Sequence, residues 1–465
     1  MKKSRKAMII RFVLENIFSF GERKEFNTLP NNRLKTLESH KYDVGDFHLL
    51  KLSALYGANG AGKSNLFKAM FLLQKLVLDQ KIPFPLKESQ FKFNKGKDIP
   101  QLLAVEFIQE GTPFYYGIEL IGERVATEEL YISGLGYQKD RLLFDRKTDK
   151  NENTTIQYAD EFQNDEKFRL LNSILLEEFV EPKQPVLKLL ANRDNKFLAD
   201  VKNAFRWFSE TLQIITPSSR PMALAHRIDV DSEFKHYAED MMCSFNLGIA
   251  SLTTEKSPIE EFFGKDNENE LNELIKRVEE SPKKMVGVRI RTGDEINLVK
   301  ENGEIWAKSL KVGHKGKDGV EVKFDLIDES DGTIRLLDFV PAFKSVISEP
   351  KVFMIDEIER SIHPLLIKEL VKKFSHDPKT KGQLIFTTHE SNLLDQELFR
   401  QDEIWFAEKN QDGATDLYSL SDFKEHKTID IRKGYLNGRY GSIPFLGNFK
   451  DLNWHEYVTQ QEPTL

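Results

Sequence analysis

The strongest constraint on the fold is the stretch 57–64, which reads Gly-Ala-Asn-Gly-Ala-Gly-Lys-Ser and fits the phosphate-binding pattern G-x-x-x-x-G-K-[ST]. The run 50–56 alternates, then turns apolar and predicts a strand, and the run 65–73 has helical spacing and no breaker. Phosphate binding needs this order, because glycines let backbone N–H groups surround phosphates and the helix N-terminus adds partial positive charge. A chance match is the alternative, and both flanks disfavour it.

The polar groups of this loop have separate expected tasks. Lys63 would reach the β- and γ-phosphates of a nucleotide, and the hydroxyl of Ser64 would hold Mg²⁺. The residues expected to bind the nucleotide in this loop are Gly57, Asn59, Gly60, Gly62, Lys63 and Ser64. The loop therefore predicts ATP and Mg²⁺ as cofactors.

Two carboxylates far downstream of the loop follow an apolar run, 352–355, that predicts a buried parallel strand. They are Asp356 and Glu357, and open α/β sheets bind ligands at the carboxyl ends of their strands. We expect Asp356 to hold the Mg²⁺ shell and Glu357 to orient or deprotonate the attacking water. The alternative is that the two acids only cap a helix. The presence of a phosphate loop in the same chain disfavours this alternative.

A histidine ends the next predicted strand, 384–388. His389 follows two threonines there, at the position of a γ-phosphate sensor. The alternative is a histidine satisfied within the core, which is the usual fate of a lone histidine. The place of His389 at a strand end favours the sensor.

Composition excludes several classes of protein. The chain has 465 residues, of which 40% are hydrophobic and 30% charged, as in a globular protein of two or three domains. Its one cysteine, Cys243, excludes a disulfide framework and a cysteine-based zinc cluster, and favours the cytoplasm. No apolar run approaches the length of a membrane span, so we expect no membrane partner. The net charge of -7 gives no general attraction to nucleic acid, so any nucleic-acid binding needs a local basic patch.

The order of predicted elements divides the chain into three parts. Strand-like pieces within 8–56 and 100–146 flank the phosphate loop, and the second group reads as an antiparallel sheet. Tyr115 and Tyr116 in that sheet are expected to pack rather than to stack on bases. Helical spacing then dominates, and strands return from Met285. The expected domains are an N-terminal ATPase lobe, 1–150, a helical insertion, 151–283, and a C-terminal ATPase lobe, 284–465.

Together these motifs resemble the ABC-type ATPase heads of the SMC/RecF/OLD superfamily, over 8–146 and 284–445. The sequence Ser330-Asp331-Gly332-Thr333 looks like a short form of the family's signature loop, and His389 is similar to its switch histidine. The resemblance implies an α/β fold: an ABC-type P-loop NTPase head with a mixed sheet flanked by helices, an antiparallel β-subdomain and a helical insertion. The insertion lacks sustained heptads, so it is not the long coiled-coil arm of a chromosome-organising ATPase.

The resemblance also implies how the protein works. Such heads hydrolyse ATP and dimerise around it, and Ser330 and Gly332 would contact the γ-phosphate that the other subunit binds. We therefore expect the chain to partner itself, as a homodimer or a higher oligomer built from dimers. For the glutamine of the family's Q-loop, Gln90 and Gln101 are both candidates.

The opening 8–20, the strand block up to Phe144 and the stretch 435–441 look like the stand-alone bacterial OLD-like AAA ATPases of anti-phage operons. In OLD nucleases a TOPRIM domain follows the ATPase head, and too few residues follow His389 for one. Asp229-Val230-Asp231 has the spacing of a nuclease metal site but lies in the insertion, where we interpret it as surface. The expected function is a sensor or scaffold of a phage-defence system with a separately encoded effector nuclease.

Two other functions stay open. One is a DNA-repair or recombination ATPase of the RecF or SMC kind, in which the head itself clamps DNA. Salt-dependent DNA binding by the isolated protein would favour it. The other is a binding module that holds ATP without turnover, which ATP-dependent dimers without phosphate release would favour.

Overall fold

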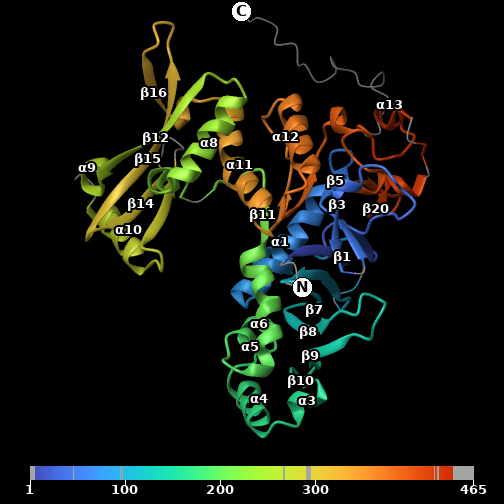
Figure 1. The fold of residues 1–465 in the computed structure, drawn as a ribbon. Coiled ribbons are helices and arrows are strands. Elements are labelled where there is room, and N and C mark those ends of the chain that lie inside the picture. Colours follow the sequence, from blue (N-terminus) through green and yellow to red (C-terminus); the bar gives the residue numbers. More distant parts are fainter. Residues whose placement is uncertain are drawn as a thin grey trace, which may run out of the picture.

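The computed structural model describes residues 6–45, 47–94, 96, 98–221, 223–264, 268–289, 295–423, 425–426 and 429–443. It has an α/β core, with one lobe below this core and a second unit beside it in the view of Figure 1. Among the described residues, no helix combines the length and the apolar character that crossing a membrane would need.

The central sheet of the core has six strands in the order β11-β17-β18-β5-β19-β20. Their bounds are Leu212–Ile215, Val352–Ile355, Gln383–Thr387, Leu52–Tyr56, Ile404–Lys409 and Thr415–Ser419. The first five are parallel and β20 is antiparallel. Every residue of β5, β17 and β18 is buried, which explains their nearly continuous apolar sequences. Their carboxyl ends therefore meet at one edge of the sheet.

Helices cover both faces of this sheet. On one face, α1 (Lys63–Asp79) lies between the central sheet and a second, antiparallel sheet, and its apolar residues join the two in one core. On the other face, α11 (Asp331–Ser348) and α12 (Pro364–His376) pack with α8 (Ser232–Ser244). The ABC-type P-loop fold that the resemblance implied is thus confirmed, with its mixed sheet flanked by helices.

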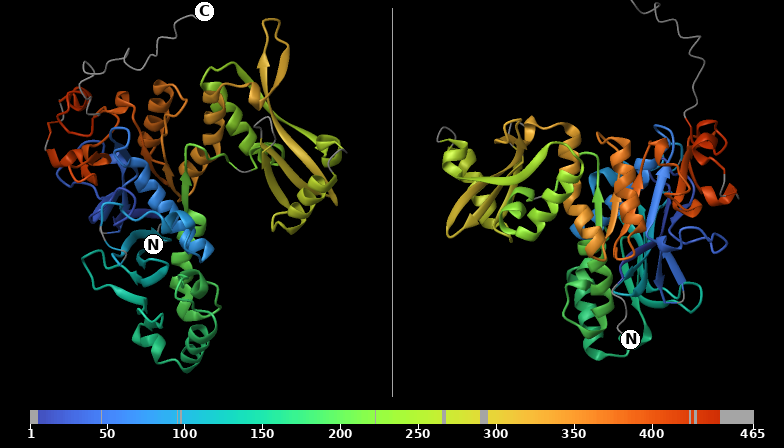
Figure 2. Two further views of the ribbon diagram at one scale, coloured as in Figure 1. Left: turned by 180° about the vertical axis from the view of Figure 1, so that it is seen from behind. Right: turned by 45° about the horizontal axis from the view of Figure 1, so that its top comes forward.

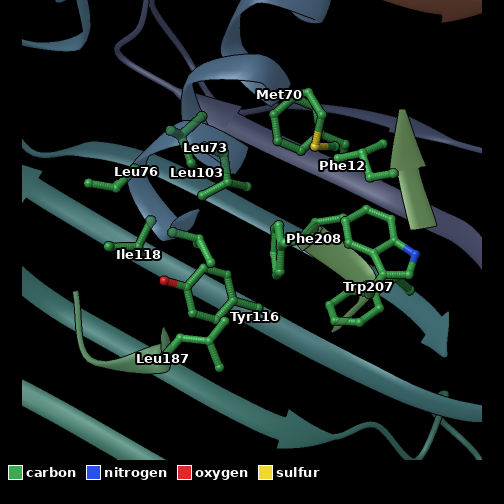
Figure 3. Packing of buried hydrophobic residues seen from close by; sticks show 14 of the residues in the cluster. Phe12, Met70, Leu73, Leu76, Leu103, Tyr116, Ile118, Leu187, Trp207 and Phe208 are labelled. Carbon is green, nitrogen blue, oxygen red and sulfur yellow. The ribbon is translucent and has the colours of Figure 1, made fainter. Parts of the chain in front are cut away.

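The antiparallel sheet has seven strands in the order β10-β9-β8-β7-β6-β1-β2. Their bounds are Thr154–Tyr158, Arg141–Thr148, Arg124–Ile132, Thr112–Ile121, Gln101–Gln109, Met8–Glu15 and Lys24–Asn27. Figure 3 shows Met70 and Leu73 of α1 beside Phe12 and Leu103 of this sheet. Tyr116 is fully buried against Phe208, so its predicted packing role is confirmed. Between β2 and β5 in the chain, β3 (Lys41–Val44) and β4 (Phe47–Leu50) pair as a small antiparallel hairpin.

The segment predicted as a helical insertion is only partly helical. Its first half forms α3 to α6, with bounds Asp160–Gln163, Glu166–Glu178, Leu187–Ala191 and Ala199–Arg206, and these helices pack against the antiparallel sheet at the bottom of Figure 1. After them, Trp207 stacks on Phe107 with ring centroids 4.3 Å apart. The same segment also contains β11, which pairs with β17 in the central sheet. Four residues are too short for a periodic pattern, so the sequence did not indicate this strand.

The strands between 285 and 326, which we expected in the C-terminal ATPase lobe, lie outside the central sheet. They form a five-stranded sheet with β12, in the order β12-β15-β14-β13, and β16 pairs with β15. The strand bounds, from β12 to β16, are Ile249–Pro258, Met285–Arg289, Glu295–Glu301, Glu304–Lys315 and Glu321–Asp325. With α7 (Leu224–Val230), α9 (Ile259–Phe263) and α10 (Glu268–Glu280) they make the unit that stands beside the core in both views of Figure 2. Strand periodicity does not reveal which partner a strand chooses. The domain boundaries at 150 and 283 stay predictions.

Candidate functional site

The phosphate loop connects β5 to α1, as the sequence predicts, and two of its glycines cannot be replaced without a clash. Gly62 has φ +109°, and a Cβ there would lie 2.2 Å from Oγ1 of Thr415. At Gly57 a Cβ would lie 2.4 Å from the carbonyl oxygen of Ala407. Both distances are far below van der Waals contact, so β19 and β20 lie directly behind the loop and allow only glycine.

Polar contacts hold the loop from behind, and the sequence did not indicate them. Oγ1 of Thr415 lies 2.7 Å from the carbonyl oxygen of Ala61 and 2.8 Å from Oγ of Ser19. Asn65 donates to the same Ser19 hydroxyl at 2.9 Å. Residues from the two ends of the chain thus support the loop. Short polar residues between strands carry no pattern that could have predicted this.

The two predicted metal ligands lie together. Oγ of Ser64 donates to Oδ1 of Asp356 at 3.1 Å, although the residues are 292 positions apart. Oγ1 of Thr387 donates to the same oxygen at 2.6 Å, and the backbone N–H of Glu357 donates to Oγ1 of Thr387 at 2.7 Å. A hydroxyl and one carboxylate suit Mg²⁺, which is held by few protein ligands together with waters and phosphate oxygens. The residues present therefore fit the ion.

Glu357 occupies an unusual backbone conformation. Its φ is +53°, in the left-handed region that a non-glycine residue adopts at a cost of about 1–3 kcal/mol. The strained turn follows directly after β17. The backbone N–H of Asp356, the preceding residue, donates to the carbonyl oxygen of Ile215 at 2.9 Å and so fixes the start of this turn. Such strain is frequent at functional sites, where the surrounding structure maintains it.

Lys63 lies against the loop that it belongs to. Its Nζ donates to the carbonyl oxygens of Gly57 and Ala58 at 2.8 and 3.1 Å, and lies 3.3 Å from Nδ1 of His389. Burial lowers the pKa of Lys63 to about 8, against the opposing effect of nearby carboxylates. Partial burial, and then the charge of Lys63, lower the pKa of His389. His389 is therefore neutral near pH 7.

Glu359 is a site residue that the sequence analysis missed. Its Oε1 accepts from the backbone N–H of His389 at 2.5 Å, and its Oε2 is buried without a partner among the described residues. Burial raises the pKa of Glu359, and its carboxylate exerts the largest attraction on the charge of Lys63. The spacing Asp-Glu-x-Glu after a buried strand is the signal in the sequence that points to Glu359.

Ser330 and Gly332 lie at the start of α11. Oγ of Ser330 accepts from the N–H of Thr333 at 3.1 Å and so caps the helix. A Cβ on Gly332 would lie 2.6 Å from the carbonyl oxygen of Ser361, so this turn packs against the segment that follows Glu357. No hydrogen bond among the described residues joins Ser330 or Gly332 to the phosphate loop. Their expected contact with a second subunit stays a prediction.

The remaining candidates make local contacts. Gln101 is buried and donates to Oγ of Ser89 at 3.1 Å, and Gln90 donates to the carbonyl of Gly96 at 3.0 Å. Asp229 accepts from Nζ of Lys308 at 2.5 Å. Asp231 caps α8 by accepting from the N–H of Phe234 at 2.9 Å. The described part of the chain holds no group of three or more metal-binding side chains that could form a nuclease centre.

A family model described as "AAA domain, putative AbiEii toxin, Type IV TA system" matches residues 52–395. Among solved structures, an SMC head bound to the C-terminal winged-helix domain of ScpA is 12% identical, with 90% of this chain and 99% of that chain covered and a TM-score of 0.42. The SMC head domain from Thermotoga maritima is 10% identical, with 88% and 98% covered and a TM-score of 0.36. An SMC head with an extended coiled coil, bound to the C-terminal domain of ScpA from Pyrococcus furiosus, is 14% identical, with 93% and 100% covered and a TM-score of 0.39. No curated protein matches the chain.

Proposed function

Because this chain belongs to the AAA-domain family that its residues 52–395 match, we propose that it binds ATP with Mg²⁺, hydrolyses ATP and dimerises around it. The observation that carries the proposal is the 3.1 Å contact between Oγ of Ser64 and Oδ1 of Asp356. It joins the end of the phosphate loop to the end of β17, so two motifs far apart in sequence supply one cation site. Mg²⁺ bound there would neutralise charge on the β- and γ-phosphates.

The residues around this point have complementary tasks in hydrolysis. Glu357 takes a proton from the attacking water, whose oxygen bonds to the γ-phosphorus while the bond to the β–γ bridging oxygen breaks and ADP leaves. Lys63 turns from the loop carbonyls to the β- and γ-phosphates. Neutral His389 then offers a hydrogen bond to the γ-phosphate. Ser330 and Gly332 of a second copy complete the site.

We further propose that the protein is the sensor or scaffold of an anti-phage system. The likeness of 8–20 and 435–441 to stand-alone OLD-like ATPases of defence operons supports this role. The family description, which names a toxin–antitoxin system, agrees with an arrangement of two components. The second component would be a separately encoded effector nuclease. Cells that express this chain with its neighbouring open reading frame should resist phage, and cells that express the chain alone should not.

Phosphate release from ATP tests the enzymatic part. Lys63→Ala removes a charge from the place where charge develops, so we expect turnover to fall at least about 100-fold and ATP affinity to weaken. Lys68→Ala, on the exposed side of α1, is the matched control and should keep wild-type turnover. Equal turnover in the two variants would disprove the role of the loop.

A further inference from the structure

A small cavity beside the start of α11 carries an excess of positive charge. Its volume is about 220 Å³, and its charged lining residues are Arg220, Arg289, Arg335, Arg360, Asp331 and Asp338. We call this cavity the arginine pocket. Four guanidinium groups face two carboxylates there. A single water needs only about 10–15 Å³ on this scale, so the pocket has room for a small anion.

Arg335 is the buried member of the pocket. Its side chain is on α11 and the residue is only 5% exposed, yet its Nε has no hydrogen-bond partner among the described residues. Its other nitrogens reach the carbonyls of Ser219 and Thr216 only at 3.3 and 3.4 Å. Burial lowers the pKa of Arg335; the carboxylate of Asp338 opposes this effect, and repulsion from Arg360 and Arg220 adds to it. A buried guanidinium with a free donor and positive neighbours is costly unless an anion joins it.

The carboxylates of the pocket do not balance this charge. Asp338 pairs with Arg220 at 2.8 Å, but burial raises the pKa of Asp338 to about 7, so part of the population is neutral near physiological pH. Arg360 is exposed and has no ion pair among the described residues. Four arginines therefore line the pocket against two carboxylates, although Glu295, outside the lining, also attracts Arg220 and Arg289.

The position of the pocket adds a further attraction for anions. It lies at the N-terminus of α11, a helix of 18 residues, where backbone N–H groups and the helix dipole favour negative charge. Ser361, four positions after Glu357, forms another part of the wall. The pocket is thus built from the start of α11 and from the segment that leaves the candidate active site.

We infer that the arginine pocket binds a phosphoryl group. A guanidinium binds phosphate oxygens through two parallel N–H···O bonds, and Arg360 lines the pocket with an exposed side chain that has no ion pair among the described residues. The phosphoryl group could come from two sources with the same chemistry. One is the γ-phosphate of ATP in the phosphate loop of a second copy, which rests on the proposed dimer. The other is a free phosphate or polyphosphate.

Calorimetric titration of tripolyphosphate into the full chain tests the second source. The Lys63→Ala background removes binding at the phosphate loop. In that background we expect Arg360→Gln to weaken tripolyphosphate affinity at least tenfold, whereas Arg169→Gln, on the exposed side of α4, should leave the affinity unchanged. Arg360 is the residue to test first because it is exposed and unpaired, so its loss should not unfold the protein. Arg335→Gln should have the larger effect if thermal melting shows that it folds.

Mixing of variants tests the first source. If the pocket receives the partner's ATP, Arg360→Gln alone should lose turnover, and an equimolar mixture with inactive Lys63→Ala should regain it. Tripolyphosphate binding that depends on Arg360, or this recovery, supports the pocket. If tripolyphosphate binding does not depend on Arg360 and the mixture recovers no turnover, the arginine pocket is disproved. Phosphate release that depends on Lys63 would in that case still support the ATPase proposal. If the wild type releases no phosphate but tripolyphosphate binding still depends on Arg360, the ATPase proposal fails and the pocket stands.

Discussion

Nζ of Lys63 lies 3.3 Å from Nδ1 of His389, although 326 positions separate them in the chain. Parallel pairing of β5 with β18 causes this, because it brings the carboxyl ends of both strands to one edge of the sheet. The ammonium of Lys63 lies between the loop carbonyls and a neutral imidazole. Movement of Lys63 to a bound nucleotide would release Nδ1 of His389. Such a movement would couple nucleotide binding to the residue that we propose as sensor.

Glu357→Gln should bind ATP and stop its hydrolysis. The change removes the proton acceptor, preserves the shape of the side chain and leaves Asp356 for the cation, so turnover should fall at least about 100-fold. The variant should accumulate as an ATP-bound dimer, measured by light scattering. Glu369→Gln, on the exposed side of α12, is the control and should keep turnover. If ATP produces no larger species with Glu357→Gln, the dimer model is wrong.

The lowered pKa of Lys63 predicts how ATP affinity depends on pH. Free Lys63 has a pKa of about 8 because it is buried, and bound phosphates favour its charged form. Above pH 8 the free protein has therefore lost a proton that the complex regains. The contribution of Lys63 to ATP affinity should be level well below pH 8, bend near pH 8 and then fall by up to about tenfold per pH unit as pH rises.

Calorimetry in two buffers of different ionisation enthalpy measures this proton uptake. At pH 8.5 the wild type should take up part of one proton on binding ATP, whereas Lys63→Met, which has no proton to regain there, should take up none. Equal uptake by both proteins would assign the titration to another group.

Glu359→Gln should move this pH dependence. The carboxylate of Glu359 is the largest influence that raises the pKa of Lys63. Its loss should lower that pKa, so ATP affinity should begin to fall at a lower pH than in the wild type. Glu397→Gln, an exposed residue without an ion pair among the described residues, should leave the profile unchanged. A uniform loss of affinity at every pH would instead indicate a purely structural role for Glu359.

The parts of the site that sequence could predict are those that short motifs encode. The glycine loop, Lys63, Ser64 and the two acids after β17 follow from local patterns, because a phosphate loop needs a strand before it and a helix after it. In the structure the hydroxyl of Ser64 lies 3.1 Å from Oδ1 of Asp356, while the roles of these residues stay predictions. Thr387, which bonds to Asp356 at 2.6 Å, lay inside a predicted strand, where nothing in its sequence indicated a role in the site.

Contacts between distant segments could not be predicted. Ser19 and Thr415 meet behind the phosphate loop only because β20 joins the central sheet beside β19. Likewise, Arg220 reaches α11 across 118 positions to pair with Asp338. The strand β11 is four residues long and gives no periodic signal, yet it forms the edge of the central sheet. Strand pairing, rather than local propensity, decides the first and the last of these cases.

Ser330→Asp separates the two tasks of Ser330. In the structure Ser330 caps α11, and aspartate is an equally good cap, so the melting temperature should stay within about 2 °C of wild type. A negative charge at the position expected to meet the γ-phosphate of the second subunit should repel it and stop turnover. Normal turnover in this variant would leave capping as the only role of Ser330. Ser330→Ala gives the converse: it loses the cap, at a cost of about 1 kcal/mol, without adding charge.

Mixing inactive Ser330→Asp with inactive Lys63→Ala then shows whether the two chains share each site. In a mixed dimer, one site combines the altered phosphate loop with the altered turn, and the other site combines the intact loop with the intact turn. The intact site should restore up to about half of the activity of a normal dimer if the two sites act independently. Native mass spectrometry must confirm that mixed dimers form. If they form and no activity returns, either Ser330 serves the site of its own chain or both sites must be intact for either to act. A wild-type chain paired with Lys63→Ala distinguishes these two cases, because that dimer also has one intact site and is inactive only when both sites are required.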